Sequence, residues 1–333
     1  MPPTPASTRK NPAPIVVTIG NFDGVHLGHQ ALLRAARTRA DSPGDRGNAG
    51  RVIAAVFAKH PAAILRDTPL APPITPSDAR AELLLHHGAD EVVAIDPTRE
   101  LLAMAPEAFL ESFFDEHRPD AIVEGDDFRF GANRAGDAST LRSFCRRRGV
   151  DPIIVEQVDV GLTDQLVVRA SSTITRWLLE RGRVGDAAIV LGRPHRLAGR
   201  VVRGDRRGRE IGFPTANLDC PALFPADGIY AGIATLDDGR RWPAAISVGT
   251  KPTFNGVHRV VEAYLCGWDG PQGDEYGWGC ALDCIAWVRG QIRFASIASL
   301  VEQIERDVDQ ILRRLDTLSG SPQFTTPMPK ALT

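Results

Sequence analysis

The sequence has no long apolar run, no signal peptide and no cysteine pattern. No stretch of its 333 residues approaches the roughly 20 apolar residues that span a bilayer, and its polar, proline-rich start lacks a signal peptide's apolar core. Five cysteines without a CxxC pair do not form a disulfide framework. We therefore expect a cytoplasmic protein with buried free thiols. A zinc site from Cys280, Cys284 and His258 is an alternative, although the spacing fits zinc poorly.

An excess of charge of one sign is also missing. Lys and Arg total 39 against 41 Asp and Glu, which gives a net charge of −2. Such a chain has no overall field that attracts nucleic acid or an anionic membrane, so we expect neither as a partner. We expect small-molecule ligands bound at local sites. With 43% hydrophobic and 24% charged residues, the composition is that of a globular protein.

The length and the hydrophobic pattern predict two domains. Up to about residue 156, short apolar runs alternate with helical patterns, which is typical of a doubly wound parallel α/β sheet. Its expected strands are 15–19, 52–57, 91–95, 121–124 and 153–156, and its helices 26–40, 77–87, 106–117 and 137–148.

After about residue 190, short runs separated by turn residues predict a small antiparallel barrel, and a three-to-four-residue apolar repeat predicts a final helix. The barrel runs are 197–202, 228–235, 242–248, 260–265 and 281–288, and the helix is 297–315. We expect an α/β domain at residues 14–188, a barrel domain at 189–318, and flexible tails at 1–13 and 319–333.

The segment between the first strand and the first helix indicates a phosphate site. It reads Gly20-Asn21-Phe22-Asp23-Gly24-Val25-His26-Leu27-Gly28-His29. A helix N-terminus binds anions, and glycines let phosphate oxygens approach the backbone. Two histidines three residues apart can donate to one phosphate group, which suits nucleotidyl transfer through stabilisation of the charged transition state. The alternative is a pair of surface histidines on an amphipathic helix. The chain contains no P-loop motif.

Two further segments of this half have a functional and a structural interpretation. In Ser171-Ser172-Thr173-Ile174-Thr175-Arg176, the guanidinium and a helix start can hold phosphate together, or a serine caps the helix and the arginine is solvated. In Gly125-Asp126-Asp127-Phe128-Arg129-Phe130-Gly131, alternating aromatic residues predict a strand that presents both rings on one face. Core packing of these rings is an equal alternative.

The barrel half opens with a loop rich in glycine and arginine, residues 199–212, which can fold over polyphosphate. Thr215 and Asn217 follow it and offer neutral oxygens on one face of an extended strand, which suits the Mg²⁺ carried by ATP. An exposed basic hairpin loop is the alternative.

These motifs, in this order, resemble the bacterial bifunctional riboflavin kinase/FAD synthetases. The three motifs of the first half resemble the family's nucleotidyltransferase module. Gly212-Phe213-Pro214-Thr215-Ala216-Asn217-Leu218, Pro225-x-Asp227-Gly228-Ile229-Tyr230-Ala231 and Gly249-Thr250-Lys251-Pro252-Thr253-Phe254 resemble its riboflavin kinase module. The resemblance covers about residues 14–316 and implies a Rossmann-like nucleotidyltransferase domain followed by a six-stranded antiparallel barrel with a C-terminal helix.

The resemblance also assigns roles to residues. It implies that His26 and His29 are catalytic in FMN adenylylation and that Glu262, in Val261-Glu262-Ala263-Tyr264, is the base that activates the ribityl hydroxyl of riboflavin. Taken alone, Glu262 is a solvent-facing strand residue. Expected ATP or phosphate ligands are Gly20, Phe22, Asp23, Gly28, Ser171, Ser172, Thr173, Arg176, Gly204, Arg209 and Gly212; expected flavin contacts are Asp127, Phe128, Phe130 and Phe213; expected Mg²⁺ ligands are Thr215 and Asn217.

The barrel half departs from the family pattern near its expected base. Tyr264 stands where the family usually has histidine, and the stretch from Cys266 to Cys280 holds five glycines and two tryptophans. The main hypothesis is a cytoplasmic enzyme that uses MgATP to convert riboflavin to FMN and FMN to FAD. The alternatives are an FMN adenylyltransferase with an impaired or altered kinase site, and a non-catalytic flavin-binding regulator. A homo-oligomer is possible.

Overall fold

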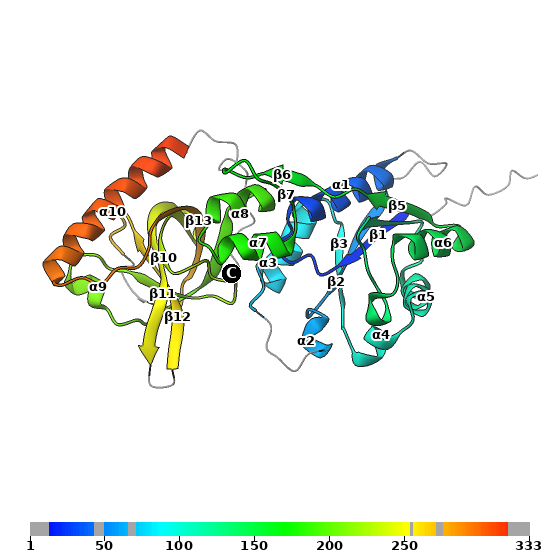
Figure 1. Ribbon diagram of the computed structural model, residues 1–333, viewed down its shortest axis with the longest axis horizontal. Coiled ribbons are helices and arrows are strands. Elements are labelled where there is room, and N and C mark those ends of the chain that lie inside the picture. Colours follow the sequence, from blue (N-terminus) through cyan, green and yellow to red (C-terminus); the bar gives the residue numbers. More distant parts are fainter. Residues whose placement is uncertain (1–12, 43–49, 66–70, 254–255, 271–275, 319–333) are drawn as a thin grey trace, which may run out of the picture. The chain divides into compact units, whose positions relative to one another are not determined.

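The computed structural model describes residues 13–42, 50–65, 71–253, 256–270 and 276–318 (Figure 1). The expected tails, apart from Ala13, lie outside the described residues, as does Phe254 of the last barrel motif. The chain forms two compact units. Unit 1 comprises Met1–Phe22, Gly28–Leu70 and Ala81–Val158, and unit 2 comprises Asp23–Leu27, Ala71–Arg80 and Asp159–Thr333.

Unit 1 is built on a parallel five-stranded sheet with the order β3-β2-β1-β4-β5. The strands are β1 (Ile15–Gly20), β2 (Arg51–Phe57), β3 (Glu91–Ile95), β4 (Ala121–Gly125) and β5 (Asp151–Val155). Because the chain leaves β1 toward β2 and β3 and later returns on the other side as β4 and β5, the sheet has a switch point between β1 and β4. The doubly wound prediction is confirmed.

Helices connect or follow these strands. They are α1 (Leu27–Asp41), α2 (Ala62–Leu65), α3 (Ser77–His86), α4 (Arg99–Ala103), α5 (Pro106–His117) and α6 (Ala138–Arg148), with a 3-10 turn at Ala132–Arg134. The helices α5 and α6 pack on the sheet through buried apolar residues. Phe109 and Phe113 of α5 and Phe144 of α6 are buried in one cluster with Val17 and Ile19 of β1. Each such side chain contributes about 1.5–3 kcal/mol when buried, so this cluster fixes the sheet that carries the β1 and β4 ends.

Unit 2 contains a closed antiparallel barrel with the order β10-β11-β12-β9-β8-β13. Its strands are β8 (His195–Val202), β9 (Ala216–Asp219), β10 (Gly228–Leu236), β11 (Arg241–Thr253), β12 (Gly256–Leu265) and β13 (Gly279–Arg289). Before the barrel come the hairpin of β6 (Asp159–Gly161) and β7 (Val167–Arg169), then α7 (Ser172–Leu179) and α8 (Val184–Leu191); α9 (Arg207–Glu210) lies between β8 and β9. The predicted barrel is confirmed.

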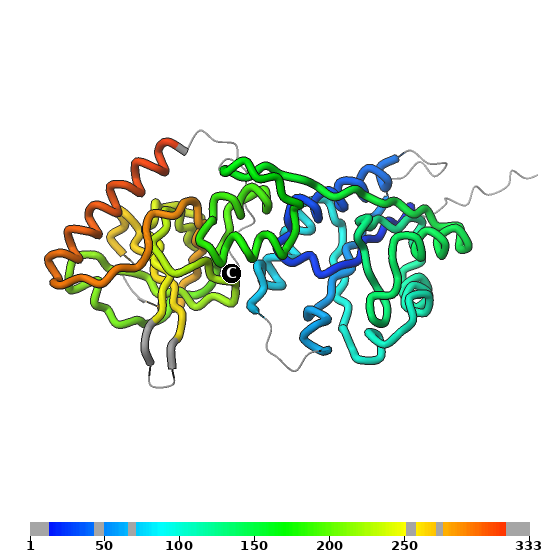
Figure 2. Tube along the Cα trace, viewed as in Figure 1, coloured from blue at the N-terminus to red at the C-terminus, as the bar shows by residue number. Residues whose placement is uncertain are grey.

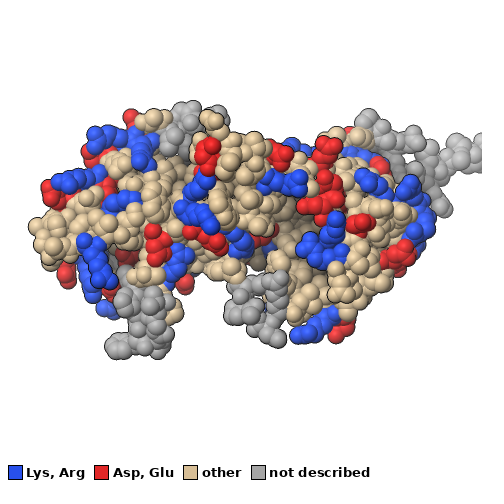
Figure 3. Space-filling model, viewed as in Figure 1, with Lys and Arg blue, Asp and Glu red and all other residues tan. Residues whose placement is uncertain are grey.

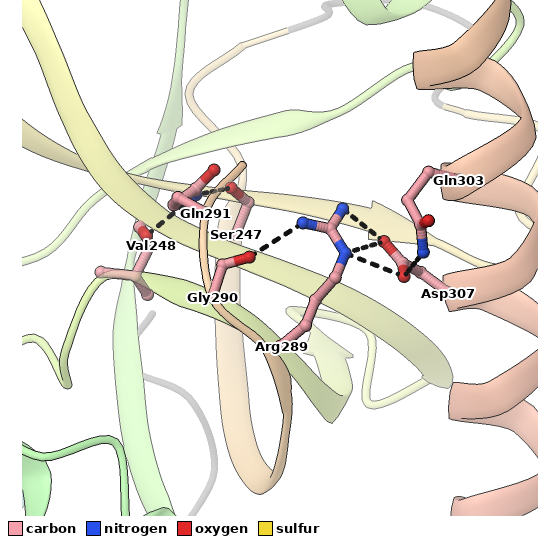
Figure 4. A network of polar contacts seen from close by, with 7 residues as sticks. All are labelled: Ser247, Val248, Arg289, Gly290, Gln291, Gln303 and Asp307. Atoms are coloured by element: carbon pink, nitrogen blue, oxygen red, sulfur yellow. Dashed lines mark hydrogen bonds and ion pairs between the residues drawn. The ribbon is translucent and has the colours of Figure 1, made fainter. Parts of the chain in front are cut away.

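The final helix, α10 (Ile297–Leu318), lies along the barrel (Figure 2). A partly buried ion pair between Arg289 of β13 and Asp307 of α10 connects the two. The Arg289 guanidinium donates to both carboxylate oxygens of Asp307, with Nη2 at 2.6 Å from Oδ2 (Figure 4). Gln303 donates to the same carboxylate at 2.9 Å. Asp307 is therefore compensated, which a buried carboxylate requires.

The surface of the chain carries both signs of charge. On the face drawn in Figure 3, basic and acidic side chains of the described residues are intermingled. The five cysteines are buried, as expected. Among the described residues, no group of three or more His, Cys, Asp or Glu is placed to hold a metal ion. Within the same ranges, no helix is both long enough and apolar enough to cross a membrane.

Candidate active sites

The switch point of the sheet brings two predicted segments to one edge of unit 1. β1 and β4 are neighbours in register, with Val16 opposite Ala121 and Val17 opposite Ile122. Because parallel strands end at the same edge, the turn after Gly20 and the segment after Gly125 start side by side. A hydrogen bond of 2.6 Å joins the two strand ends, from the Ile19 N–H to the Glu124 carboxylate.

Glu124 is a residue that the sequence analysis missed. Its side chain is buried, and burial raises its pKa well above the usual value. The carboxyl group thus ties the end of β4 to the end of β1 beneath the two predicted ligand segments. A charged residue at the end of the apolar run Ala121–Val123 was the available signal.

The aromatic segment after β4 is not a strand, so that prediction was wrong. Asp126 and Asp127 form a turn, closed by the Phe128 N–H donating to the Gly125 carbonyl at 3.1 Å. The alternation of aromatic residues matched a strand period, but the turn interrupts the extended backbone. The rings of Phe128 and Phe130 are nonetheless stacked, with centroids 5.0 Å apart and planes inclined by 22°.

The two stacked rings differ in their exposure. Phe130 is buried and packs against Phe109, so core packing describes it correctly. Phe128 is half-buried and Asp127 is exposed. Of the predicted flavin contacts in unit 1, Phe128 and Asp127 are therefore the accessible pair, and Phe130 supports Phe128 from below.

The turn between β1 and α1 has an unusual backbone. Phe22, Gly24 and Val25 have positive φ angles of 50°, 86° and 41°. Positive φ is strained for residues other than glycine, most of all for a β-branched residue, and such strain is concentrated at functional sites. Phe22 is buried, and its ring meets the His29 ring edge-on at 5.0 Å.

The two predicted catalytic histidines lie at the start of α1. His26 directly precedes the helix, and His29 is its third residue. The first turn of α1 carries no acidic residue, so its N–H groups and positive dipole end are not neutralised from within the helix. Burial, and after it the charge of Arg193, lowers the pKa of His26 to about 4. His26 is therefore a neutral imidazole at pH 7 and acts as a neutral hydrogen-bonding group.

Asp23 connects the turn to the Ser-Ser-Thr-x-x-Arg helix within unit 2. Its carboxylate accepts hydrogen bonds from Arg176 Nη2 at 2.6 Å and from the Thr75 N–H at 3.2 Å. Its backbone carbonyl accepts from the Ser172 hydroxyl at 2.7 Å. Arg176 Nη1 also donates to the Pro72 carbonyl at 2.7 Å. The structure thus brings Asp23, Ser172 and Arg176 together, and Asp23 orients the guanidinium.

The sequence allowed two interpretations of that helix: a phosphate-binding helix start with Arg176, or a serine cap with a solvated arginine. Ser171 agrees with the second interpretation and Arg176 does not. Ser171 caps α7, since its hydroxyl accepts from the Ile174 N–H at 3.2 Å. Thr173 is exposed in the first turn. Arg176, however, is ion-paired and only a quarter exposed, with 25% of its side-chain surface accessible, so it is not a freely solvated arginine.

The second site lies on the outer face of the barrel. Glu262 of β12 stands directly opposite Asn217 of β9 and opposite Ser247 of β11. Its neighbours Val261 and Ala263 are buried inside the barrel, so Glu262 and Asn217 share the opposite face. The structure therefore brings the predicted base and one predicted metal ligand together. Thr215 precedes β9 and is exposed.

The glycine-rich loop before β9 is positioned by its glycines. A Cβ on Gly204 would overlap the side chain of Asn217, and one on Gly208 would overlap the Phe213 carbonyl. Gly212 has a φ of 86°, a conformation that favours glycine. Arg209 of α9 is exposed. The loop therefore lies directly against the Asn217 end of the site.

The unusual barrel segment has its own contacts. Tyr264, two residues along β12 from Glu262, meets the Phe213 ring edge-on with centroids 5.2 Å apart. Trp268 and Trp278 pair in the same way at 5.1 Å. Residues 271–275 lie outside the described residues.

Tyr276 also contacts the glycine-rich loop. Its hydroxyl accepts from Arg206 Nε at 2.8 Å, and the Arg206 guanidinium lies over its ring. Tyr276, with Gly277, is what this segment keeps of the family pattern, whereas Tyr264, which contacts Phe213, departs from it.

A doubly wound sheet with a phosphate-type turn at its switch point, followed by a closed barrel, is the architecture of a two-module nucleotide-handling protein. Family models agree with this division: a FAD synthetase model matches residues 8–169, and a riboflavin kinase model matches residues 191–315. The helix α7 lies between the two matches.

Individual proteins match along most of the chain. The bifunctional riboflavin kinase/FMN adenylyltransferase of Escherichia coli (strain K12) is 33% identical over 295 residues, covering 88% of this chain and 90% of its own. That of Bacillus subtilis (strain 168) is 28% identical over 316 residues, covering 93% and 95%. A crystal structure described as a macrolide-efflux protein from Streptococcus pneumoniae is 28% identical with a TM-score of 0.80, covering 91% and 95%. The chain belongs to the bifunctional riboflavin kinase/FMN adenylyltransferase family.

Proposed function

We propose that the chain makes FAD from riboflavin in two ATP-dependent steps at two separate sites. It is a bifunctional enzyme that phosphorylates riboflavin to FMN and adenylylates FMN to FAD, with release of pyrophosphate. One observation carries the assignment of two sites. Glu262 and Asn217 face each other on the barrel, whereas Asp23 and Arg176 join a different, histidine-containing turn.

At the first site, a phosphate oxygen of FMN attacks the α-phosphorus of ATP, and the bond from that phosphorus to pyrophosphate breaks. Charge grows on the α-phosphate oxygens, so preorganised donors stabilise the transition state. We assign this role to His26, His29 and the N–H groups at the start of α1. Arg176, held by Asp23, retains N–H groups for the ATP phosphates.

We propose roles for the other predicted ligands of this reaction as well. Gly20, Phe22 and Gly28 shape the turn, and Ser171, Ser172 and Thr173 open the helix that carries Arg176. Phe128 offers a half-buried ring for the flavin, with Asp127 exposed beside it. Phe130 serves as the support of Phe128 and not as a direct contact.

At the second site, Glu262 accepts the proton of the ribityl hydroxyl as its oxygen attacks the γ-phosphorus of ATP. Thr215 and Asn217 offer a hydroxyl and an amide oxygen, which suit the hard cation Mg²⁺ that accompanies ATP and neutralises charge on its phosphates. The loop with Gly204, Arg209 and Gly212 covers the phosphates, and Phe213 contacts the flavin.

The setting of the enzyme follows from the same chemistry. We propose small-molecule partners, ATP, riboflavin and FMN, and a cytoplasmic location. Neither nucleic acid nor membrane is an expected partner. Assembly into a homo-oligomer is a prediction that size-exclusion chromatography with light scattering would test.

One alternative has a specific observation in its favour. Tyr264, which stands where the family usually has histidine, packs against the Phe213 ring, so this difference bears directly on the kinase site. This favours an FMN adenylyltransferase with a weakened kinase as the second candidate. A non-catalytic flavin-binding regulator is the third, and it has no need for a base at Glu262.

A single assay separates the candidates. The purified protein is incubated with ATP, Mg²⁺ and either riboflavin or FMN, and both flavin products are followed by chromatography. FAD from both starting flavins is the expected result. FAD from FMN alone would establish the weakened kinase, and bound flavin without product from either would establish the binding protein.

A further inference from the structure

Arg193 is a buried arginine in the short segment between α8 and β8. It belongs to the residues matched by the riboflavin kinase model, 191–315, and only 6% of its surface is exposed. Its guanidinium nevertheless reaches the phosphate-type turn, 169 residues earlier in the chain. Nη2 donates to the Gly24 carbonyl at 2.7 Å and to the Thr75 hydroxyl at 3.3 Å, and Nη1 donates to the Val25 carbonyl at 3.3 Å.

These bonds fall on the strained part of the turn. Gly24 and Val25 have φ angles of 86° and 41°. A non-glycine residue in this region is strained and persists only where its surroundings fix it. The planar guanidinium fork of Arg193 donates to the Gly24 and Val25 carbonyls at once, which restricts the orientation of both peptide groups. The turn conformation just before His26 is thus held by a residue 169 positions further along the chain than Gly24.

Among the described residues, no carboxylate accepts a hydrogen bond from Arg193, although Asp283 lies close enough to attract its charge. All four of its hydrogen-bond acceptors are neutral oxygens. Two nearby carboxylates are engaged elsewhere: Asp23 pairs with Arg176, and Asp283 pairs with Arg196 at 2.7 Å. A buried cation without a paired anion is costly for stability alone. It does, however, create a positive potential at a turn that faces phosphates.

We propose that Arg193 is a positioning residue for FMN adenylylation, which fixes the Gly24–Val25 turn and adds positive charge next to it. The inference rests on the proposed function of the His26 site. A residue of the kinase-matched segment thereby serves the other reaction. Arg193 does not touch the reacting atoms; it acts through the backbone that carries His26.

The test compares variants of the full-length protein in both reactions. Arg193→Met removes the fork and the charge, and Arg193→Lys keeps the charge without the fork. We expect the kcat of FAD formation from FMN to fall about 100-fold for Arg193→Met and about tenfold for Arg193→Lys. The KM for FMN and the rate of FMN formation from riboflavin should stay within about threefold.

Two further measurements distinguish positioning from general stability. Arg183→Met removes the pairs of Arg183 with Asp164 and Asp186 near the other end of α8 and so destabilises unit 2 without touching the turn. It should leave both rates within about twofold at temperatures below unfolding. The pKa of His26, measured by NMR, should rise in Arg193→Met and stay low in Arg193→Lys, because the nearby charge is lost only in the first.

Other titratable or charged groups around this turn are unchanged in these variants. They are Asp23, Arg80, Arg176, His195, Arg196 and Asp283. A change in the pKa of His26 therefore reports on Arg193.

The outcomes separate the inference from the proposed function. No FAD from the wild-type protein would overturn the proposed function and the inference with it. FAD from the wild type and equal rates in the Arg193 variants would overturn the inference alone. So would a parallel loss of both activities, since that is the result of a purely structural role. If Arg193→Met does not fold, Arg193→Lys decides by the same criteria.

Discussion

The two sites are held together in opposite ways. At the turn before α1, Asp23 is bound by Arg176, 153 residues away, and the following carbonyls are bound by Arg193. On the barrel, Glu262 lies opposite Asn217 in strand register, and the adjacent loop is positioned by glycines. The first site depends on side chains that are distant in the sequence, and the second depends on backbone geometry. Substitutions should therefore separate the two activities.

Glu262→Gln is expected to produce the largest difference between the two activities. The amide keeps the size and shape of the carboxylate but cannot accept the proton of the ribityl hydroxyl. We expect FMN formation from riboflavin to fall by about 10³-fold, within the range for loss of a general base. FAD formation from FMN should be unchanged. Initial rates of both reactions, followed by chromatography, provide the measurement.

A matched control tests whether the charge itself matters. Glu302→Gln removes a carboxylate from α10 that is exposed and paired only with Arg306. Both activities should remain at the wild-type level. Little loss of FMN formation in Glu262→Gln would show that Glu262 is not the base, and would support the FMN adenylyltransferase with an altered kinase site.

His29→Ala is expected to produce the second largest difference, with FAD formation lowered and FMN formation retained. Loss of one donor to the α-phosphate should lower FAD formation from FMN by about 10²-fold, as for the loss of one preorganised donor elsewhere. FMN formation should be retained. His86→Ala, at the exposed end of α3, is the control and should leave both rates unchanged. A joint loss of both activities in a folded His29→Ala protein would contradict the two-site assignment.

The same contrast, between distant contacts and local geometry, explains what the sequence could predict. Helices and strands were predicted well because their hydrophobic period depends only on neighbouring residues: the helix at 106–117 has the predicted bounds, and β2 differs by one residue. The barrel strand β9 was not recognised as a separate run because four residues are too short for a pattern. Phe128 and Phe130 alternate with Arg129 as residues of a strand do, but they follow a turn at Asp126 and Asp127, so the predicted strand was wrong.

The candidate sites divide in the same manner. Motifs singled out His26 and His29, which lie at the start of α1, and Asn217 and Glu262, which the structure places opposite each other on neighbouring strands. Nothing in the local sequence marks Arg193, because its function depends on a contact with Gly24. The pairing of Asp23 with Arg176 was likewise outside the reach of pattern analysis, although both residues were singled out.

The buried surroundings of the turn predict a third difference, in stability at low pH. Burial lowers the pKa of both His26 and His195 to about 4, from 6.5 in the unfolded chain. Between these values the unfolded chain binds more protons, so stability falls as the pH falls from 6.5 toward 4. At pH 5 each histidine should cost about 2 kcal/mol relative to pH 7.5, roughly 30-fold in the folding equilibrium.

Urea unfolding at pH 7.5 and pH 5 measures this loss, and His195→Gln isolates one contribution. The His195 imidazole donates from Nε2 to the Leu223 carbonyl at 2.7 Å, and a glutamine amide can keep this bond without titrating. The variant should lose less stability than the wild type between the two pH values. An identical pH dependence would show that His195 is not protonated on unfolding in this range.

The smallest effect is expected from Gly204→Ala, which disturbs the barrel site through its backbone. The added Cβ would overlap the Asn217 side chain, which must turn away from Glu262 or push the loop outward. Because an exposed loop can give way, we expect only about a tenfold fall in FMN formation, with a higher KM for ATP. Gly161→Ala, where an added Cβ meets nothing within 4 Å, is the matched control and should leave the kinase unchanged. FAD formation from FMN should be the same in both variants, since the turn before α1 depends on neither glycine. Equal kinase rates in Gly204→Ala and Gly161→Ala would show that the loop does not lie against Asn217 during phosphoryl transfer, and the barrel site would then depend on strand register alone.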